Sequence, residues 1–292
     1  MPDSRLLVDL FHLVRRNRFL WFFGLFAGTG SFNFSFNFPT GDDSGGSADS
    51  ASSIDPAVVV AIAGGALLLL LVFLALSAIS QGALADSVAA LYRGEERRFG
   101  IAWTAGRSTF WRVVGLFILT GLIGLGLLLL IVLPLGGLVF GVFSATDEVA
   151  ARIVVAVLAG LGALALLLVV FVPYSVIVQF AIRGVTLRKN RIRESLRAGW
   201  QLFRHNLGAS LLTVGIQYGI AIAAGFVIGI VTVVVAIPLV ILLLATDASA
   251  VAIGAAIFGA VLLLPVLLAA SGALGAYNHG LWTLSYLRLA GP

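Results

Sequence analysis

Apolar residues fill most of this chain in long unbroken runs, and charged residues gather in the short stretches between them. Five runs exceed the ~20 mostly apolar residues that a membrane-spanning helix needs. They cover residues 56–80, 113–143, 151–181, 207–245 and 250–280. A sixth, shorter candidate lies at 17–38. The pattern predicts an all-α integral membrane protein with six transmembrane helices.

Residues 32–38, FNFSFNF, depart from the helical pattern because phenylalanine alternates strictly with small polar residues. Such alternation is typical of a half-buried strand, but we find no second segment that could pair with it. The run from Phe19 to Gly30 alone is too short for a core of ~30 Å at 1.5 Å per residue. We therefore expect FNFSFNF to form the outer end of the first span, helical or unwound. Asn33 and Asn37 would then face other helices or an outer vestibule.

The distribution of charge predicts the orientation. Basic residues cluster at 5–18, 93–112, 183–204 and 288, so 17 of the 18 lie on one side of a six-span arrangement, with Arg152 as the exception. By the positive-inside rule, we expect both termini in the cytoplasm. Five spans would place the termini on opposite sides, so the charge pattern supports 17–38 as a true span.

Composition agrees with a membrane location. Of 292 residues, 60% are hydrophobic and 11% charged, and the mean hydropathy is +1.11, whereas soluble domains carry about 25% charged residues. The bias toward Ala, Gly, Leu, Val and Arg is typical of a GC-rich bacterial genome, so we expect the bacterial cytoplasmic (inner) membrane. We interpret residues 1–292 as a single membrane domain, in which 39–55 form a flexible external loop.

The sequence also repeats weakly, with a period near 95 residues. AGRSTFWRVVG (105–115) aligns with AGWQLFRHNLG (198–208), and HLVRRNRFL (12–20) resembles QLFRHNLGA (201–209). We expect three parallel units, each an interfacial amphipathic helix followed by two spans. The units would cover residues 5–92, 100–187 and 193–288. Chance similarity among stretches rich in Leu, Ala, Gly and Arg is the alternative.

The interfacial helices combine basic and aromatic side chains, a pattern typical of helices that lie on a membrane with arginines toward anionic headgroups. We expect this surface to bind anionic membrane lipid, or a partner protein at the cytoplasmic face. The alternative is that the arginines only keep their loops inside. We expect no nucleic acid partner, because the membrane topology explains the basic charge. The docking candidates are Arg15, Arg16, Arg18, Arg107, Trp111, Arg112, Arg188, Lys189, Arg191, Arg193, Trp200 and Arg204.

Residues that could perform chemistry are sparse. His12, His205 and His279 lack metal-binding spacing and are interpreted as ordinary surface residues near the ends of spans. The sequence contains no cysteine, and we find no hydrolase, Walker-type or zinc-peptidase motif. We therefore expect no enzyme activity, metal or cofactor. Polar residues at membrane depth either pack helices or line a cavity, and the candidates are Asn33, Asn37, Gln179, Gln217 and Tyr218.

Three segments resemble a known group of proteins: RRNRFLWFFGLFAG (15–28), IAWTAGRSTFWRVVGLFIL (101–119) and SLRAGWQLFRHNLGASLL (195–212). They are similar to uncharacterised bacterial six-transmembrane-helix families related to the membrane domain of glycerophosphodiester phosphodiesterase. The resemblance implies the six-helix fold. It hardly implies an activity, because the catalytic domain of the phosphodiesterase has no counterpart in this chain.

Three functions are therefore open. The first is a non-enzymatic scaffold or regulatory protein whose interfacial helices bind anionic lipid or a partner protein. The second is a transporter or channel for an apolar or lipid-like solute, which would need a central cavity with polar residues from several spans. The third, an enzyme acting on lipid headgroups, would need Asp86, His205 and His279 to meet.

Overall fold

The computed structural model describes residues 4–28, 56–245 and 250–291, and that part of the chain is helical, without strands. Its helices are α1 (Ser4–Arg16), α2 (Phe19–Gly28), α3 (Pro56–Tyr92), α4 (Phe99–Ala145), α5 (Val149–Leu187), α6 (Ile192–His205), α7 (Leu207–Ala245) and α8 (Ala250–Ala290). Five of these helices are long and apolar enough to cross a membrane, namely α3, α4, α5, α7 and α8. The prediction of an all-α membrane protein is thus confirmed. FNFSFNF and the loop 39–55 lie outside the described residues.

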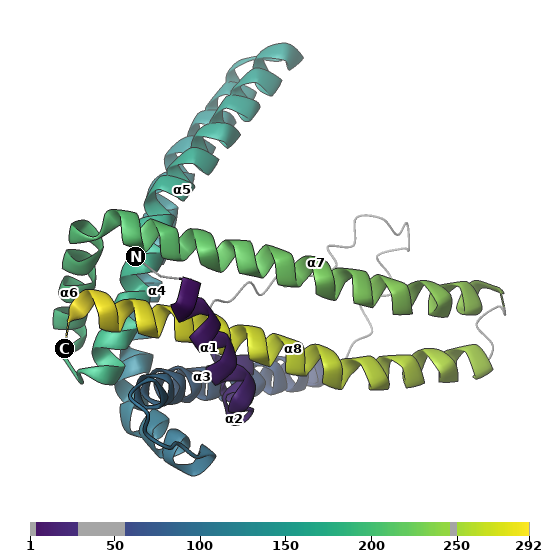
Figure 1. Cartoon of the computed structure of the whole chain (residues 1–292). Helices are drawn as coiled ribbons and strands as arrows, with labels where there is room; N and C mark the ends of the chain where they lie inside the picture. Colours follow the sequence, from purple (N-terminus) through teal and green to yellow (C-terminus); the bar gives the residue numbers. More distant parts are fainter. Residues whose placement is uncertain (1–3, 29–55, 246–249, 292) are drawn as a thin grey trace.

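The buried core lies at one end of the molecule, which we call the basic end. It comprises α1, α2, α6, the last turns of α3, α5 and α8, and the first turns of α4 and α7 (Figure 1). Leu10, Phe23, Leu84, Leu116 and Phe180 are among its fully buried side chains. Both the N-terminal helix α1 and the end of α8 belong to this core, so the two ends of the described chain lie close together.

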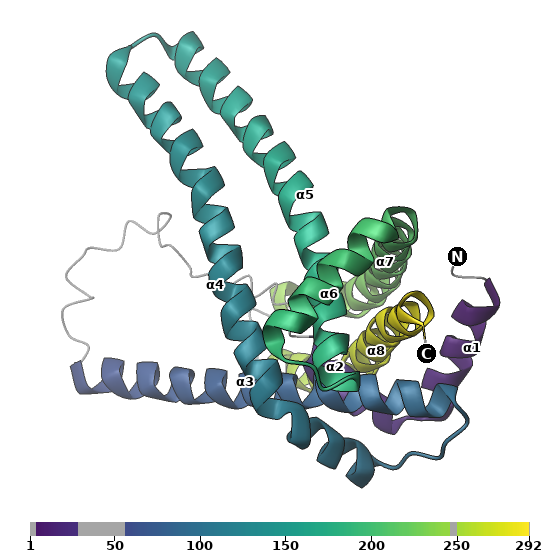
Figure 2. The same cartoon turned by 90° about the vertical axis from the view of Figure 1, so that its left-hand side faces the viewer.

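The outer halves of the long helices leave the basic end in three different directions. Figure 2 shows α3, the α4–α5 hairpin and the paired helices α7 and α8 as diverging arms. Within the described residues, none of the most apolar stretch of α3, α5 or α7 is buried. Apolar surface of this extent is typical of helices that face lipid.

Close crossings between helices hold the basic end together, and glycine makes them possible. A Cβ atom on Gly24 would overlap the backbone of Gly272, so α2 and α8 meet backbone to backbone. Gly106 brings α4 equally close to the backbone of α3. On α6, a Cβ on Gly199 would lie 2.8 Å from the carbonyl oxygen of Ile177 on α5. Small residues at such crossings let membrane helices approach closely.

Asparagine forms the corner between an interfacial helix and the next helix at two places. The Nδ2 group of Asn17 donates to the carbonyl oxygen of Leu13 at 2.9 Å, and that of Asn206 to Leu202 at 3.2 Å. Helices α1 and α6 each end one residue before this asparagine. The aligned residue in α4 is Val113, and α4 continues through it without a break. The interfacial helix expected before the third span is therefore continuous with that span in α4.

Candidate functional site

A charged side chain, that of Arg183 on α5, lies completely inside the protein with 1% of its surface exposed. Its Nη1 donates to the main-chain oxygen of Gln179 at 3.0 Å and to the side-chain oxygen of the same residue. Its Nη2 donates to Nδ1 and to the main-chain oxygen of His279 on α8, at 3.1 and 3.3 Å. The hydrogen-bond acceptors around this guanidinium are thus neutral groups from two helices.

His279, which is 6% exposed, connects this arginine to a third helix. Its Nε2 lies 3.0 Å from the carbonyl oxygen of Ala27 on α2. Because arginine can only donate and a carbonyl can only accept, Nδ1 must be the acceptor and Nε2 must carry the proton. Arg183 and His279 therefore connect α5, α8 and α2 inside the basic end.

This network corrects two interpretations of the sequence. His279 is not a surface residue, and Arg183 does not belong to a basic cluster on the membrane surface. Helix α5 continues to Leu187, beyond the end of the apolar run, and α8 covers its last turns. By contrast, His12 and His205 are exposed, and His205 Nδ1 lies 2.8 Å from the main-chain oxygen of Gln201.

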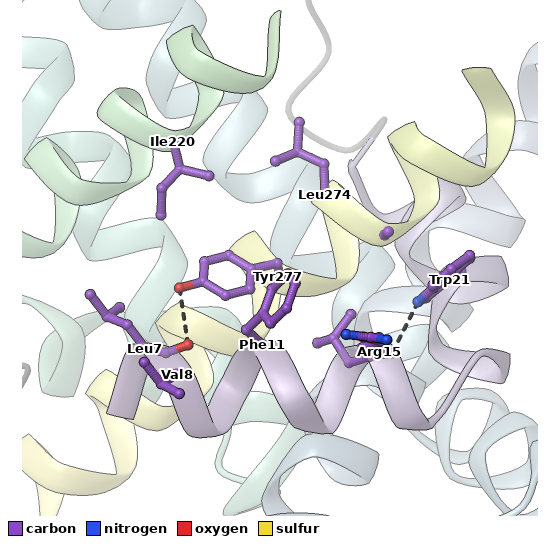
Figure 3. A pocket seen from close by; sticks show the side chains of 10 residues that line it. Leu7, Val8, Phe11, Arg15, Trp21, Ile220, Leu274 and Tyr277 are labelled. Atoms are coloured by element: carbon purple, nitrogen blue, oxygen red, sulfur yellow. Dashed lines mark hydrogen bonds between the residues drawn. The ribbon is translucent and has the colours of Figure 1, made fainter. Parts of the chain in front are cut away.

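A cavity of about 720 Å³, here called the α1 cavity, lies between α1, α7 and α8 (Figure 3). Its walls are almost entirely apolar, and Arg15 is the charged residue that lines it. The two polar groups of its aromatic residues are already bonded to α1. Trp21 Nε1 donates to the carbonyl oxygen of Val14 at 3.0 Å, and the hydroxyl of Tyr277 to that of Leu7 at 3.4 Å. Arg15 is therefore the group left to recognise a polar ligand.

A second cavity of about 760 Å³, here called the inter-span cavity, is lined by α3, α4 and α5 together with Tyr218 of α7. Leucine, valine, phenylalanine, isoleucine and glycine form most of its wall, and polar groups come from Gln81, Thr120, Tyr174, Ser175, Gln179 and Tyr218. The hydroxyl of Thr120 donates to Leu116 at 2.7 Å, and that of Tyr174 donates to the carbonyl oxygen of Thr120. The side-chain amides, together with the hydroxyl of the exposed Tyr218, thus remain as the groups available to a ligand.

The predicted cavity residues have different positions in the structure. Gln179 and Tyr218 line the inter-span cavity. Gln217 accepts a hydrogen bond of 2.6 Å from Trp282 Nε1 and is not among the lining residues described. Asn33 and Asn37 lie outside the described residues. Gln81 also lines this cavity and was not among the predicted cavity residues, although a repeat offset of 98 residues relates it to Gln179.

Every predicted docking residue is exposed, and the side chains of Trp111 and Trp200 are 80% and 50% exposed. Two of the arginines also hold the α5–α6 loop in place. Arg112 Nη1 donates to the main-chain oxygen of Lys189 at 2.6 Å, and Arg188 Nη2 donates to that of Ala290 at 3.0 Å. None of the ion pairs formed within the described residues involves a docking candidate.

The turn that follows α3 is stabilised by ion pairs of its own. Arg93 Nε lies 2.8 Å from a carboxylate oxygen of Glu95. This hydrogen bond holds the pKa of Glu95 below its usual value. Arg97 lies 3.4 Å from Glu95 and 3.3 Å from Asp86 of α3, so its guanidinium ties the turn to the helix.

No convergent catalytic group emerges from the described residues. Asp86 pairs with Arg97, His205 with a main-chain oxygen and His279 with Arg183, so these three side chains have separate partners. No group of three His, Asp or Glu residues in the described part of the chain could hold a metal ion.

A family model of unknown function, DUF7544, matches residues 14–282 of the chain. Neither curated proteins nor solved structures match the chain. The family match carries no link to glycerophosphodiester phosphodiesterase, and that part of the resemblance stays a prediction.

Proposed function

We propose that this chain, which belongs to the DUF7544 family of unknown function, is a non-enzymatic membrane protein that binds anionic lipid at its basic end in a scaffold or regulatory role. The α1 cavity carries the proposal. Its apolar walls fit acyl chains, and Arg15 fits a headgroup phosphate. Each cation near an anionic leaflet contributes about 1 kcal/mol, and Arg16 and Arg18 lie exposed beside Arg15 in the chain. A partner protein at the same face is the other candidate ligand.

The arrangement that we propose has six spans with both termini on the cytoplasmic side of the bacterial inner membrane. Its support is the position of the chain ends, because α1 contacts α8 near Tyr277 and Arg188 bonds the end of α8. Two ends on one face need an even number of crossings. Helix α2 has 10 residues, too few by itself for a core of ~30 Å at 1.5 Å per residue, so the sixth crossing rests on the proposed span 17–38.

We also propose that the chain consists of three repeated units. Two contacts between helices support this. Gly106 of α4 lies against the carbonyl oxygen of Ile79 on α3, and Gly199 of α6 lies against that of Ile177 on α5. The two glycines match in the sequence alignment, and the two isoleucines are 98 residues apart, the same offset that relates Gln81 to Gln179. In both places the start of one unit packs on the second span of the unit before it.

Replacing Arg15 with glutamine should reduce binding of phosphatidylglycerol about fivefold, because one cation of about 1 kcal/mol is lost from the α1 cavity. Native mass spectrometry of the purified full chain, with phosphatidylglycerol added in steps, would measure the bound fraction. The matched control is Arg197→Gln, which removes an exposed arginine of α6 that is not a docking candidate and does not line the cavity. Equal losses in the two variants would contradict a site at the α1 cavity.

The alternative function, transport of an apolar or lipid-like solute, is favoured by a different observation. The inter-span cavity takes polar residues from four long helices, as a path between spans would require. We keep it as the second proposal, which flux measurements in liposomes would test.

A further inference from the structure

Gln81 on α3 is the unexplained residue of the inter-span cavity. It lines the cavity and is 4% exposed, yet its side-chain carbonyl oxygen has no hydrogen-bond partner. Burying an unpaired amide carbonyl is unfavourable, and such groups in native proteins usually have a partner, a water or a ligand. The orphaned oxygen therefore marks a place where a donor group is missing.

Gln179 on α5 supplies the opposite kind of group. Arg183 donates to its side-chain oxygen, which fixes the orientation of the amide, since a guanidinium cannot bond to the NH₂ end. The nitrogen of Gln179 is consequently the free end of that side chain. Helices α3 and α5 are in contact, so the cavity brings together an acceptor on one helix and a donor on the next.

The other residues that line the inter-span cavity indicate the charge and polarity of the rest of the ligand. The residues described as lining the cavity include no Asp, Glu, Lys, Arg or His, so none of the lining side chains would compensate a buried charge. Leu74, Leu164 and Phe171 are typical of the other lining residues. A wall of this kind suits hydrocarbon, and one polar group at the two amides would orient it.

We propose that the inter-span cavity binds an uncharged, largely apolar molecule with a free hydroxyl group, such as a long-chain alcohol or a diacylglycerol. The hydroxyl donates to Gln81 Oε1 and accepts from the amide nitrogen of Gln179. This site differs from the α1 cavity in position and in ligand charge, so it does not rest on the binding of anionic lipid.

The test compares two probes on the purified full chain in detergent: 1,2-dioctanoylglycerol and its 3-O-acetyl ester, which lacks the hydroxyl. Native mass spectrometry would give both affinities. We expect the diacylglycerol to bind at least about tenfold more tightly, because only it can pair the buried oxygen. Equal binding of the two probes would overturn the proposal.

Three variants identify the site. Gln81→Leu should abolish the preference for the hydroxyl, whereas Gln201→Leu, which changes an exposed glutamine of α6, should keep it. If Gln81→Leu does not fold, Leu164→Trp offers a second test, because Leu164 is 55% exposed and a larger ring there fills the cavity from its open side. That variant should weaken both probes, and unchanged binding would reject the cavity as the site.

Competition separates this inference from the proposed function. Phosphatidylglycerol should not displace dioctanoylglycerol, and Arg15→Gln should leave the affinity for dioctanoylglycerol unchanged. Displacement by phosphatidylglycerol would show one general lipid surface and would overturn the separate neutral site.

Discussion

Replacing Gly24 with alanine should prevent α2 from docking on α8 and leave little folded protein. The added Cβ would overlap the main-chain oxygen of Gly272 and would also meet the backbone of Ala276. Overpacking usually destabilises by about 1–3 kcal/mol when side chains can move aside. Here the obstacles are backbone atoms of a helix, so only separation of the two helices relieves the clash. We expect a loss of about 3 kcal/mol or more.

Gly64→Ala on α3 is the matched control, because a Cβ at Gly64 would meet nothing within 4 Å. Alanine exceeds glycine by about 1 kcal/mol in helix propensity, so this variant should be as stable as the parent or slightly more so. Melting temperature and the monodisperse fraction in size-exclusion chromatography, in one detergent, would compare the two. A Gly24→Ala protein that melts together with Gly64→Ala would show that α2 and α8 do not cross at this glycine.

The long apolar helices of this protein could be predicted because hydropathy is a property of contiguous residues. The run at 207–245 coincides with α7, and four more runs coincide with helices that could cross a membrane. The ends of the helices were harder to place. Helix α3 continues to Tyr92 and α8 to Ala290, well beyond their apolar runs. Those last turns are buried by other helices at the basic end, and a pattern read along one segment contains no information about such neighbours.

Functional candidates that depend on residues distant in the sequence were missed for the same reason: a local pattern contains no information about neighbours from other helices. Arg183 follows directly after an apolar run and begins a segment rich in arginine, so its sequence context is that of a membrane surface. Its burial depends on His279, which is 96 residues away. The unpaired oxygen of Gln81 likewise lies at a cavity that residues of α4, α5 and α7 also line, and these residues are distant from Gln81 in the sequence. The two glycines at helix crossings, Gly106 and Gly199, could be found from the sequence, because the repeat alignment pairs them.

Removing His279 alone should destabilise the protein more than removing His279 and Arg183 together. His279→Leu leaves the charge of Arg183 buried without one of its acceptors, and an unsatisfied buried charged group costs more than the about 1–3 kcal/mol of an unsatisfied neutral group. Arg183→Met removes the charge and leaves only neutral groups unpaired, which costs about 1–3 kcal/mol. The double variant has no buried charge, so its melting temperature should lie above that of His279→Leu.

A double-mutant cycle measures this coupling, with unfolding followed by heat or denaturant in a fixed detergent. The control cycle uses Arg197→Met and His205→Leu, which change an exposed arginine and an exposed histidine of α6. The changes in unfolding free energy caused by those two substitutions should be additive within about 0.5 kcal/mol. If the cycle of Arg183 and His279 is equally additive, the two side chains do not form the buried contact that the structure shows.

Conservative variants of His279 should separate its two hydrogen bonds. In His279→Asn the side-chain oxygen can take the place of Nδ1 and accept from Arg183, but the bond to Ala27 is lost. In His279→Gln the amide nitrogen can replace Nε2 and donate to Ala27, but the acceptor for Arg183 is lost. Hydrogen bonds with a charged partner are about twice as strong as neutral ones, so the asparagine variant should melt at the higher temperature. A more stable glutamine variant would mean that the contact between α2 and α8, rather than neutral solvation of Arg183, is the main reason for a histidine at this position.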